Sequence, residues 1–245
     1  IRRSLLNMKS IIEGQRSLAF WLSQQIDVSL NHPEKKVRES AEELVSLMTP
    51  VVKSFFTDMG TEITNEAIQV FGGYGYTKDQ GIEQLYRDNR ITPIYEGTNS
   101  VQAIDLVFRK VLNNKILSKF VTLIKDEIKN DKNKTELKKF SKILEHNLAL
   151  LLEFTNWLED KNKNNKDDVS SACNDFLKVL GYISLGYSWF KTTKISLEKL
   201  SENKDFYEEK INTAKYFFDK IFPRIESHYQ SAKSGSYSIM NAKFN

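Results

Sequence analysis

The chain has 245 residues, of which 40% are apolar and 11% aromatic, so it is long enough to bury one large core or two smaller ones. Its 36 Lys and Arg residues nearly balance its 32 Asp and Glu residues and are interspersed with them, which argues against a dedicated nucleic-acid binder. The single cysteine, Cys173, excludes an intrachain disulfide, and no apolar run approaches the roughly 20 residues of a membrane span. We therefore expect a globular protein with a cytoplasmic location.

The first 70 residues have the apolar period of long helices. Apolar side chains three, four or six positions apart predict a helix over about residues 2–29. A second pattern over residues 37–59 continues past Pro50, where the missing N–H should kink or restart the helix. A third apolar run, over residues 63–71, leads into two glycines. We expect antiparallel helices with a short connection, as in a helix bundle. Because Ile1 already lies in a helical pattern, we also expect a piece of a longer polypeptide.

A short helix is predicted over residues 81–90. It is followed by an extended segment at Ile91–Ile94, since a proline disfavours helical backbone in the residue before it. Thr98 resembles the N-cap of the next long helix, in which Asp105 lies four residues before Arg109 as a supporting ion pair.

The second half is also helical in period, and the predicted fold class is all-α. Two stretches rich in lysine and asparagine, residues 129–139 and 159–168, are expected to be solvated connections between helices. Gly181 and Gly186, with a serine between them, would let a neighbouring helix approach closely. We predict two parts: a bundle over residues 1–117 and a C-terminal helical extension over residues 118–245.

The search for chemistry leaves one stretch, from Gln69 to Gln102, which holds five of the ten glycines. The three histidines lack metal-ligand spacing, so no metal site is expected, and Cys173 is expected to be a buried structural thiol. Gly72 and its glycine neighbours can bring backbone N–H groups close to an anion such as a pyrophosphate, although a plain helix cap has the same pattern. Glu96 precedes a helix start among apolar neighbours. A carboxylate in such a poorly hydrated place is suited to proton abstraction, but a capping role is the plain alternative.

Two strings in this stretch, Q-V-F-G-G-Y-G-Y and R-D-N-R-I-T-P-I-Y-E-G-T-N-S-V-Q, are separated by about ten residues. Together they resemble the signature of the C-terminal domain of flavin-dependent acyl-CoA dehydrogenases. The resemblance implies that residues 1–117 are the later helices of that bundle, lacking its first helix. Residues 118–245 are similar to the extra helical domain of a larger subgroup, which acts on medium to long acyl-CoAs and includes methylthiopropanoyl-CoA dehydrogenases.

The resemblance also implies a reaction. Glu96 would remove the α-proton of an acyl-CoA thioester while a hydride leaves the β-carbon for the flavin, and a 2-enoyl-CoA would form. The backbone N–H of Glu96 would polarise the thioester carbonyl, and Tyr95 and Gly97 would line the acyl pocket. The substrate would be an acyl-CoA, with 3-methylthiopropanoyl-CoA as one candidate, and electron-transferring flavoprotein would accept the electrons.

The cofactor implied by the resemblance is FAD. Gln69 and the backbone of Gly72 and Gly73 would meet the FAD pyrophosphate of a neighbouring subunit, and Thr98 would meet the flavin of its own subunit. Ser100 is a further cofactor candidate, although it departs from the glutamine found there in some members. This sharing implies a homodimer or a dimer of dimers. Because the family builds its sites partly from domains that precede this bundle, the chain alone is not expected to be a competent enzyme.

Three other functions are compatible with the same residues. An acyl-CoA oxidase would share the base and the flavin contacts but pass electrons to oxygen. A DNA-associated relative would need a concentrated basic face. A non-catalytic helical assembly module would bind no flavin.

Overall fold

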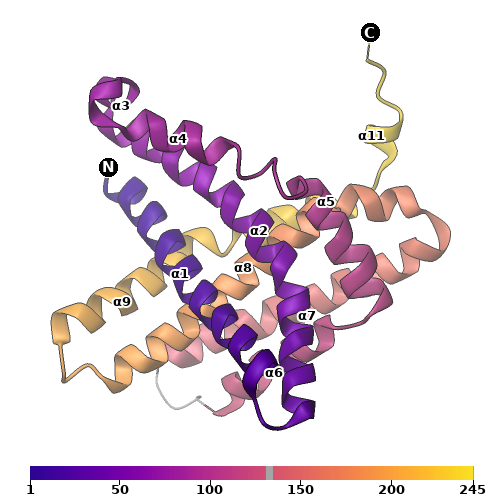
Figure 1. Ribbon diagram of the computed structural model, residues 1–245, viewed down its shortest axis with the longest axis horizontal. Helices are drawn as coiled ribbons and strands as arrows, with labels where there is room; N and C mark the ends of the chain where they lie inside the picture. Colours follow the sequence, from indigo (N-terminus) through magenta and orange to yellow (C-terminus); the bar gives the residue numbers. More distant parts are fainter. Residues whose placement is uncertain (131–134, 245) are drawn as a thin grey trace.

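The computed structural model describes residues 1–130 and 135–244, and within these ranges it contains helices and turns but no strand (Figure 1). The all-α prediction is therefore confirmed. In chain order the helices are α1 (Arg2–Asn31), α2 (Lys35–Phe71), α3 (Gly73–Tyr76), the 3-10 turn η1 (Lys78–Gln80), α4 (Ile82–Arg90), α5 (Asn99–Ile104), the π-helix η2 (Asp105–Asn113), α6 (Leu117–Asn130), α7 (Thr135–Asn164), α8 (Lys166–Glu198), α9 (Lys204–Tyr216), the π-helix η3 (Phe217–Ile221), α10 (Arg224–Lys233) and α11 (Tyr237–Met240).

The helices α1 and α2 pack side by side and are joined by a short turn, as predicted. Of the kink or restart expected at Pro50, the restart does not occur, because α2 continues through this residue and includes the third apolar run. Losing one helical hydrogen bond at a proline costs about 3 kcal/mol. Burial of Leu47, Met48 and Val51 on both sides of Pro50 offsets that cost, so the helix does not end there.

The segment after α4 is a series of turns, so the predicted extended backbone is wrong. The N–H groups of Ile94 and Tyr95 both donate to Ile91 O, at 2.9 and 3.1 Å. Thr92 Oγ1 donates to Asn89 O at 2.7 Å and satisfies a carbonyl at the end of α4. Hydrogen bonding at the helix end overrides the local preference of the residue before a proline.

The stretch 159–168 is helical on both sides of Asn165, and the predicted solvated connection is wrong there. The Asn165 side chain accepts from Asp167 N at 3.2 Å and caps α8. Asp168 is almost fully buried, and Lys161 and Ser236 donate to its carboxylate, which lowers its pKa to about 2. Of the other stretch, residues 131–134 lie outside the described residues and residues 135–139 begin α7.

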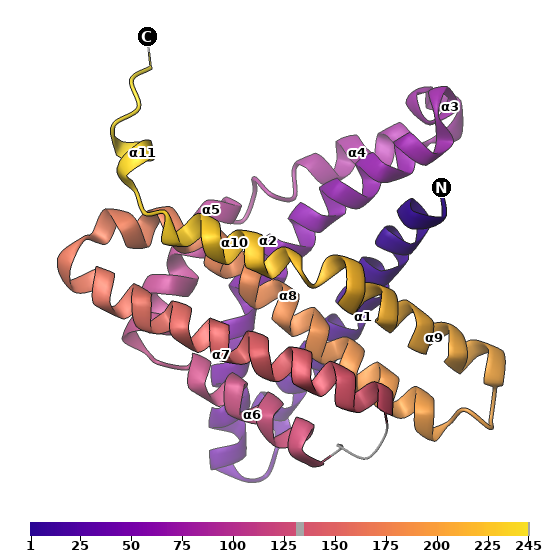
Figure 2. The same cartoon turned by 180° about the vertical axis from the view of Figure 1, so that it is seen from behind.

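One apolar core runs through both predicted parts, and α8 lies at its centre (Figure 2). This helix contacts α1, α2 and α5 of the first part and α7, α9 and α10 of the second. Gly181 and Gly186 allow the close approach that was predicted. A Cβ atom at Gly181 would lie 2.4 Å from Phe55 Cδ2, and one at Gly186 would lie 2.5 Å from Phe222 Cε2. The two parts share a core, and the boundary at residue 117 stays a prediction.

The tight contact at Gly181 gives a stability prediction. Gly181→Val should lower the free energy of unfolding of residues 1–245 by about 1–3 kcal/mol, because its side chain would overlap the buried Phe55 ring. Urea denaturation measures this change. Gly73→Ala is the matched control, since a Cβ atom at Gly73 meets nothing within 4 Å. Equal stabilities for the two variants would show that α2 and α8 are not this close.

Candidate active-site loop

The segment between α4 and α5 is fastened to the middle of α2 by the side chain of Asn99. Asn99 Nδ2 donates to Asp58 Oδ1 at 2.6 Å. It also lies 3.0 Å from Thr57 Oγ1 and 3.1 Å from Ser54 O. Asn99 Oδ1 accepts from Lys53 Nζ at 2.9 Å. Because all these partners belong to one stretch of α2, the start of α5 has a fixed position along that helix.

Two more side chains hold the backbone at Glu96. Lys53 Nζ donates to Gly97 O at 2.7 Å, in addition to its bond with Asn99. Gln102 Nε2, one turn into α5, donates to Glu96 O at 2.9 Å. The carbonyl groups of Glu96 and Gly97 are therefore fixed by long side chains rather than by regular secondary structure.

Glu96 has a φ of 54°, in the left-handed region that non-glycine residues rarely adopt. Its neighbour Gly97 has a φ of 78°, which a glycine adopts freely. The left-handed conformation costs a residue with a Cβ atom roughly 1–2 kcal/mol. The hydrogen bonds from Lys53 and Gln102 are of the size needed to offset that cost. Such strain persists where its surroundings determine it, and it is frequent at functional sites.

The side chains of the loop face outward. The exposed candidates here are Tyr95, Glu96, Gly97, Thr98 and Ser100. The poorly hydrated surroundings that we expected for Glu96 are therefore not provided by the described residues. The loop presents its carboxylate on an open surface of this chain.

The two cofactor candidates at the start of α5 have different surroundings. Thr98 Oγ1 accepts from Val101 N at 3.5 Å, so the predicted N-cap is confirmed. Ser100 Oγ accepts from Asn174 Nδ2, on α8, at 3.5 Å. The second half of the chain thus reaches the loop directly at Ser100.

Gln69, Gly72 and Gly73 lie at the far end of α2, at the tip of the hairpin that α2 forms with α4 (Figure 1). At about 1.5 Å per helical residue, the stretch of α2 from Ser54 to Phe71 spans about 26 Å. The structure therefore does not bring these three residues to the Glu96 loop. All three are exposed, and Gly72 has a φ of 63°.

Gly73 has an ordinary φ and open space around its missing Cβ, so no contact in the described chain requires a glycine there. Gly73 is exposed and is the first residue of the short helix α3. An exposed backbone donor beside a left-handed glycine is a suitable place for an anion.

Sequence reasoning missed the residues that hold the loop. Asn99 and Gln102 lie inside the singled-out stretch, and an asparagine just after an N-cap was a usable signal. Lys53 and Asp58 lie 44 and 41 residues before their partners Gly97 and Asn99, within the ordinary amphipathic pattern of α2. Nothing local distinguishes them from solvated helix residues.

The other candidate groups have structural surroundings. Cys173 is buried and donates to Val169 O, and burial raises the pKa of its thiol to about 12. His228 Nδ1 lies 2.8 Å from Asp175 Oδ1. Across residues 1–130 and 135–244, no group of three or more His, Cys, Asp or Glu side chains is placed to hold a metal ion. None of the described helices has both the length and the apolar character needed to cross a bilayer.

Comparison with known families covers nearly the whole chain. Residues 1–111 match the family model described as the acyl-CoA dehydrogenase C-terminal domain. Residues 120–243 match the model described as acetyl-CoA dehydrogenase C-terminal like. The two models thus assign to this chain two consecutive helical regions of one family. The chain belongs to the acyl-CoA dehydrogenase family.

Two curated relatives illustrate the similarity. The 3-methylmercaptopropionyl-CoA dehydrogenase of Ruegeria pomeroyi is 40% identical over 114 residues, which are 46% of this chain and 19% of that protein. The broad-specificity linear acyl-CoA dehydrogenase FadE5 of Mycobacterium tuberculosis is 27% identical over 256 residues, which are 98% of this chain and 42% of that protein. The chain therefore spans less than half the length of these relatives.

Solved structures share the fold. Caenorhabditis elegans ACDH-11 in complex with C11-CoA superposes with a TM-score of 0.78 at 21% identity, over 99% of this chain and 40% of that one. An acyl-CoA dehydrogenase from Bacillus anthracis complexed with FAD superposes with a TM-score of 0.73 at 18% identity, over 94% of this chain and 41% of that one. Both likenesses extend across the two family regions.

Proposed function

We propose that the full-length protein is an FAD-dependent acyl-CoA dehydrogenase in which Glu96 is the catalytic base. Glu96 takes the α-proton of an acyl-CoA thioester, and the two electrons of the β-C–H bond leave with the hydride, so that a 2-enoyl-CoA forms. FAD, when bound, supplies the hydride acceptor. Membership of the family and the placement of Glu96 on a loop held by Lys53 and Gln102 support this assignment.

The observation that carries the proposal is the backbone of Glu96. Its left-handed φ and its fixed carbonyl set the direction of the side chain, while the carboxylate stays exposed and able to meet a substrate. A base must lie within hydrogen-bond reach of the proton it removes, so a loop with one backbone geometry favours proton transfer. In this proposal the Glu96 N–H donates to the thioester carbonyl, and Tyr95 and Gly97 line the acyl chain.

The residues present fit FAD at two separate places. Gln69 with the open backbone of Gly72 and Gly73 offers an anion site for the pyrophosphate. Thr98 and Ser100 lie beside the base, on the segment that Asn99 fastens to α2 at Ser54, and Ser54 is about 26 Å along α2 from Phe71. The glycine site at the end of α2 and the Thr98–Ser100 site of one chain are therefore too far apart to suit a single flavin. We propose that Gln69, Gly72 and Gly73 serve the flavin of a neighbouring subunit in a homodimer or a dimer of dimers.

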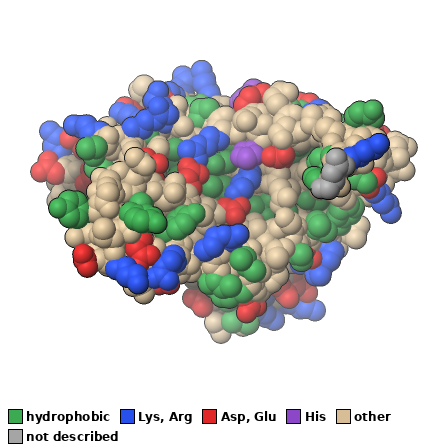
Figure 3. Space-filling view, turned by 90° about the horizontal axis from the view of Figure 1, so that it is seen from above, with side chains coloured by type: hydrophobic (Ala, Val, Ile, Leu, Met, Phe, Trp, Pro, Cys, Tyr) green, Lys and Arg blue, Asp and Glu red, His purple; other side chains and the backbone are tan. Residues whose placement is uncertain are grey.

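The substrate class in this proposal is an acyl-CoA, and 3-methylthiopropanoyl-CoA is the specific candidate. The 40% identical relative named for the corresponding reaction supports that choice. We further propose electron-transferring flavoprotein as the acceptor and a cytoplasmic location, which suits a chain with one free, buried cysteine. On the face shown in Figure 3, Lys and Arg are interspersed with Asp and Glu, so no concentrated basic face there favours a nucleic-acid partner.

Glu96→Gln tests the chemistry in the full-length protein. An amide cannot accept the proton, so kcat with acyl-CoA should fall by roughly 10²- to 10⁴-fold while FAD content and acyl-CoA affinity stay unchanged. Glu42→Gln, at an exposed position of α2, is the matched control and should keep wild-type turnover. Turnover like that of the wild type in Glu96→Gln would remove Glu96 from the reaction.

Subunit sharing predicts complementation between two inactive variants. Co-assembled Glu96→Gln and Gly73→Asp chains should recover about a quarter of wild-type activity. Random pairing makes half of the dimers mixed, and each mixed dimer contains one site with an intact base and an intact Gly73 from its partner. Activity assays on co-expressed, differently tagged chains measure the recovery. If Glu96 and Gly73 of one chain serve the same flavin, the mixed dimers will show no recovery of activity. An active monomer in light scattering would also contradict subunit sharing.

A further inference from the structure

A series of polar contacts connects α8, in the second half of the chain, with the Glu96 loop. Lys178 on α8 forms an ion pair with Asp58 Oδ2 on α2. The other oxygen of that carboxylate, Oδ1, accepts from Asn99 Nδ2 at 2.6 Å. Asp58 therefore stands between a cation of the second half and the amide that fastens the loop.

The Lys178 side chain has little freedom to leave this position. It is 18% exposed, and its ammonium lies 5.6 Å from the centre of the Phe55 ring. The same ring packs against Gly181, one turn further along α8. The stem and the charge of Lys178 are thus held by the close contact of α2 and α8.

Removing the Lys178 charge would leave the Asp58 carboxylate without the cation that pairs with it. That carboxylate is 30% exposed. Lys53 is the cation already bonded to Asn99 Oδ1, and it also donates to Gly97 O. A carboxylate attracts an ammonium more strongly than a neutral carbonyl does. An unpaired Asp58 would therefore draw Lys53 away from the Gly97 carbonyl and free the backbone beside Glu96.

We propose that Lys178, from the second half of the chain, is a positioning residue for the base: by pairing with Asp58 it keeps Asn99 and Lys53 in the arrangement that fixes the Glu96 loop. The inference rests on the proposed function of Glu96 and assigns no contact between Lys178 and the substrate. It gives the C-terminal extension a role in catalysis in addition to its role in the core.

The test compares variants of the full-length holoenzyme in single-turnover flavin reduction by acyl-CoA. Lys178→Met should slow flavin reduction roughly 10- to 100-fold, because the base is displaced, while FAD content and the Kd for acyl-CoA stay at wild-type values. With substrate deuterated at the α-carbon, the isotope effect on this step should increase. Lys178→Arg keeps the charge and should retain most of the rate.

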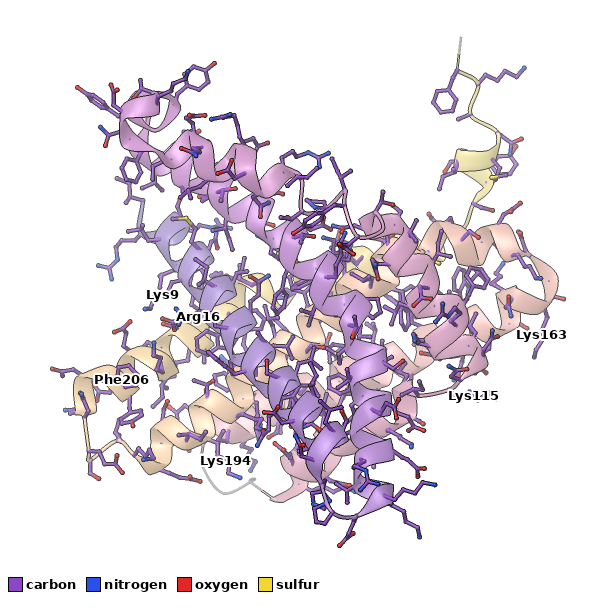
Figure 4. All side chains as sticks on the ribbon, in the orientation of Figure 1. Lys9, Arg16, Lys115, Lys163, Lys194 and Phe206 are labelled. Atoms are coloured by element: carbon purple, nitrogen blue, oxygen red, sulfur yellow. The ribbon has the colours of Figure 1, made fainter. Side chains whose placement is uncertain are left out.

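A double variant separates charge balance from packing. Asp58→Asn combined with Lys178→Met removes both charges, leaves an acceptor for Asn99, and should recover most of the lost rate. The matched control is Lys210→Met on α9. Lys210 is 19% exposed, pairs with Glu13 and lies 4.9 Å from the centre of the Phe206 ring. Phe206 lies at the left edge of the molecule in Figure 4. The Lys210→Met variant should show the wild-type rate of flavin reduction.

The inference is overturned if Lys178→Met reduces flavin within threefold of the wild type, or if the double variant is as slow as Lys178→Met. If Lys178→Met does not accumulate as folded protein, Lys178→Gln carries the same comparison. A failure of the proposed function is recognised separately: Glu96→Gln would then reduce flavin like the wild type, whatever the Lys178 variants do.

Discussion

The Asn99 side chain joins the start of α5 to the middle of α2, and the geometry of the candidate base depends on it. Its amide meets Ser54, Thr57 and Asp58 as acceptors and Lys53 as a donor, so it is hydrogen-bonded on both sides. An apolar side chain at this half-buried position would leave several of these groups unpaired, at about 1–3 kcal/mol for each one that is buried. Asn99 thereby fixes a loop that has no regular structure of its own to a continuous helix of 37 residues.

That rigidity is what allows a glutamate to occupy left-handed backbone. Lys53 and Gln102 fix the carbonyls of Gly97 and Glu96, and their hydrogen bonds offset the torsional cost. The carboxylate is consequently directed by its backbone rather than by contacts of its own, and it remains free for a substrate. Helix α8 contributes to the same core, and its Lys178 pairs with Asp58, which accepts a hydrogen bond from Asn99. The C-terminal extension is therefore connected to the Glu96 loop through Asp58 and Asn99.

The sequence predicted most of the helices because their apolar period is strong, and it predicted the Thr98 cap and the close approach at Gly181 from residue chemistry. It misplaced features for which tertiary contacts outweigh local preference. Pro50 stays inside α2 because both flanks are buried, and the stretch 159–168 is helical on both sides of Asn165 because Asp168 finds partners. The candidate base was found through two recognisable strings. Lys53, Asp58 and Lys178 carried no local signal, since their partners are 40 or more residues distant.

The most direct test of this account follows the α-proton itself. In full-length protein whose flavin has been reduced beforehand, hydride transfer is blocked, and reversible proton abstraction should exchange the α-hydrogen of bound acyl-CoA with D₂O, as read by mass spectrometry. The account predicts that wild type exchanges it and that Asn99→Ala does so roughly 10- to 100-fold more slowly at unchanged acyl-CoA affinity. Asn147→Ala, which removes a bond to Ile143 O within α7, should match wild type. Equal exchange by wild type and Asn99→Ala would contradict the claim that this amide positions the base.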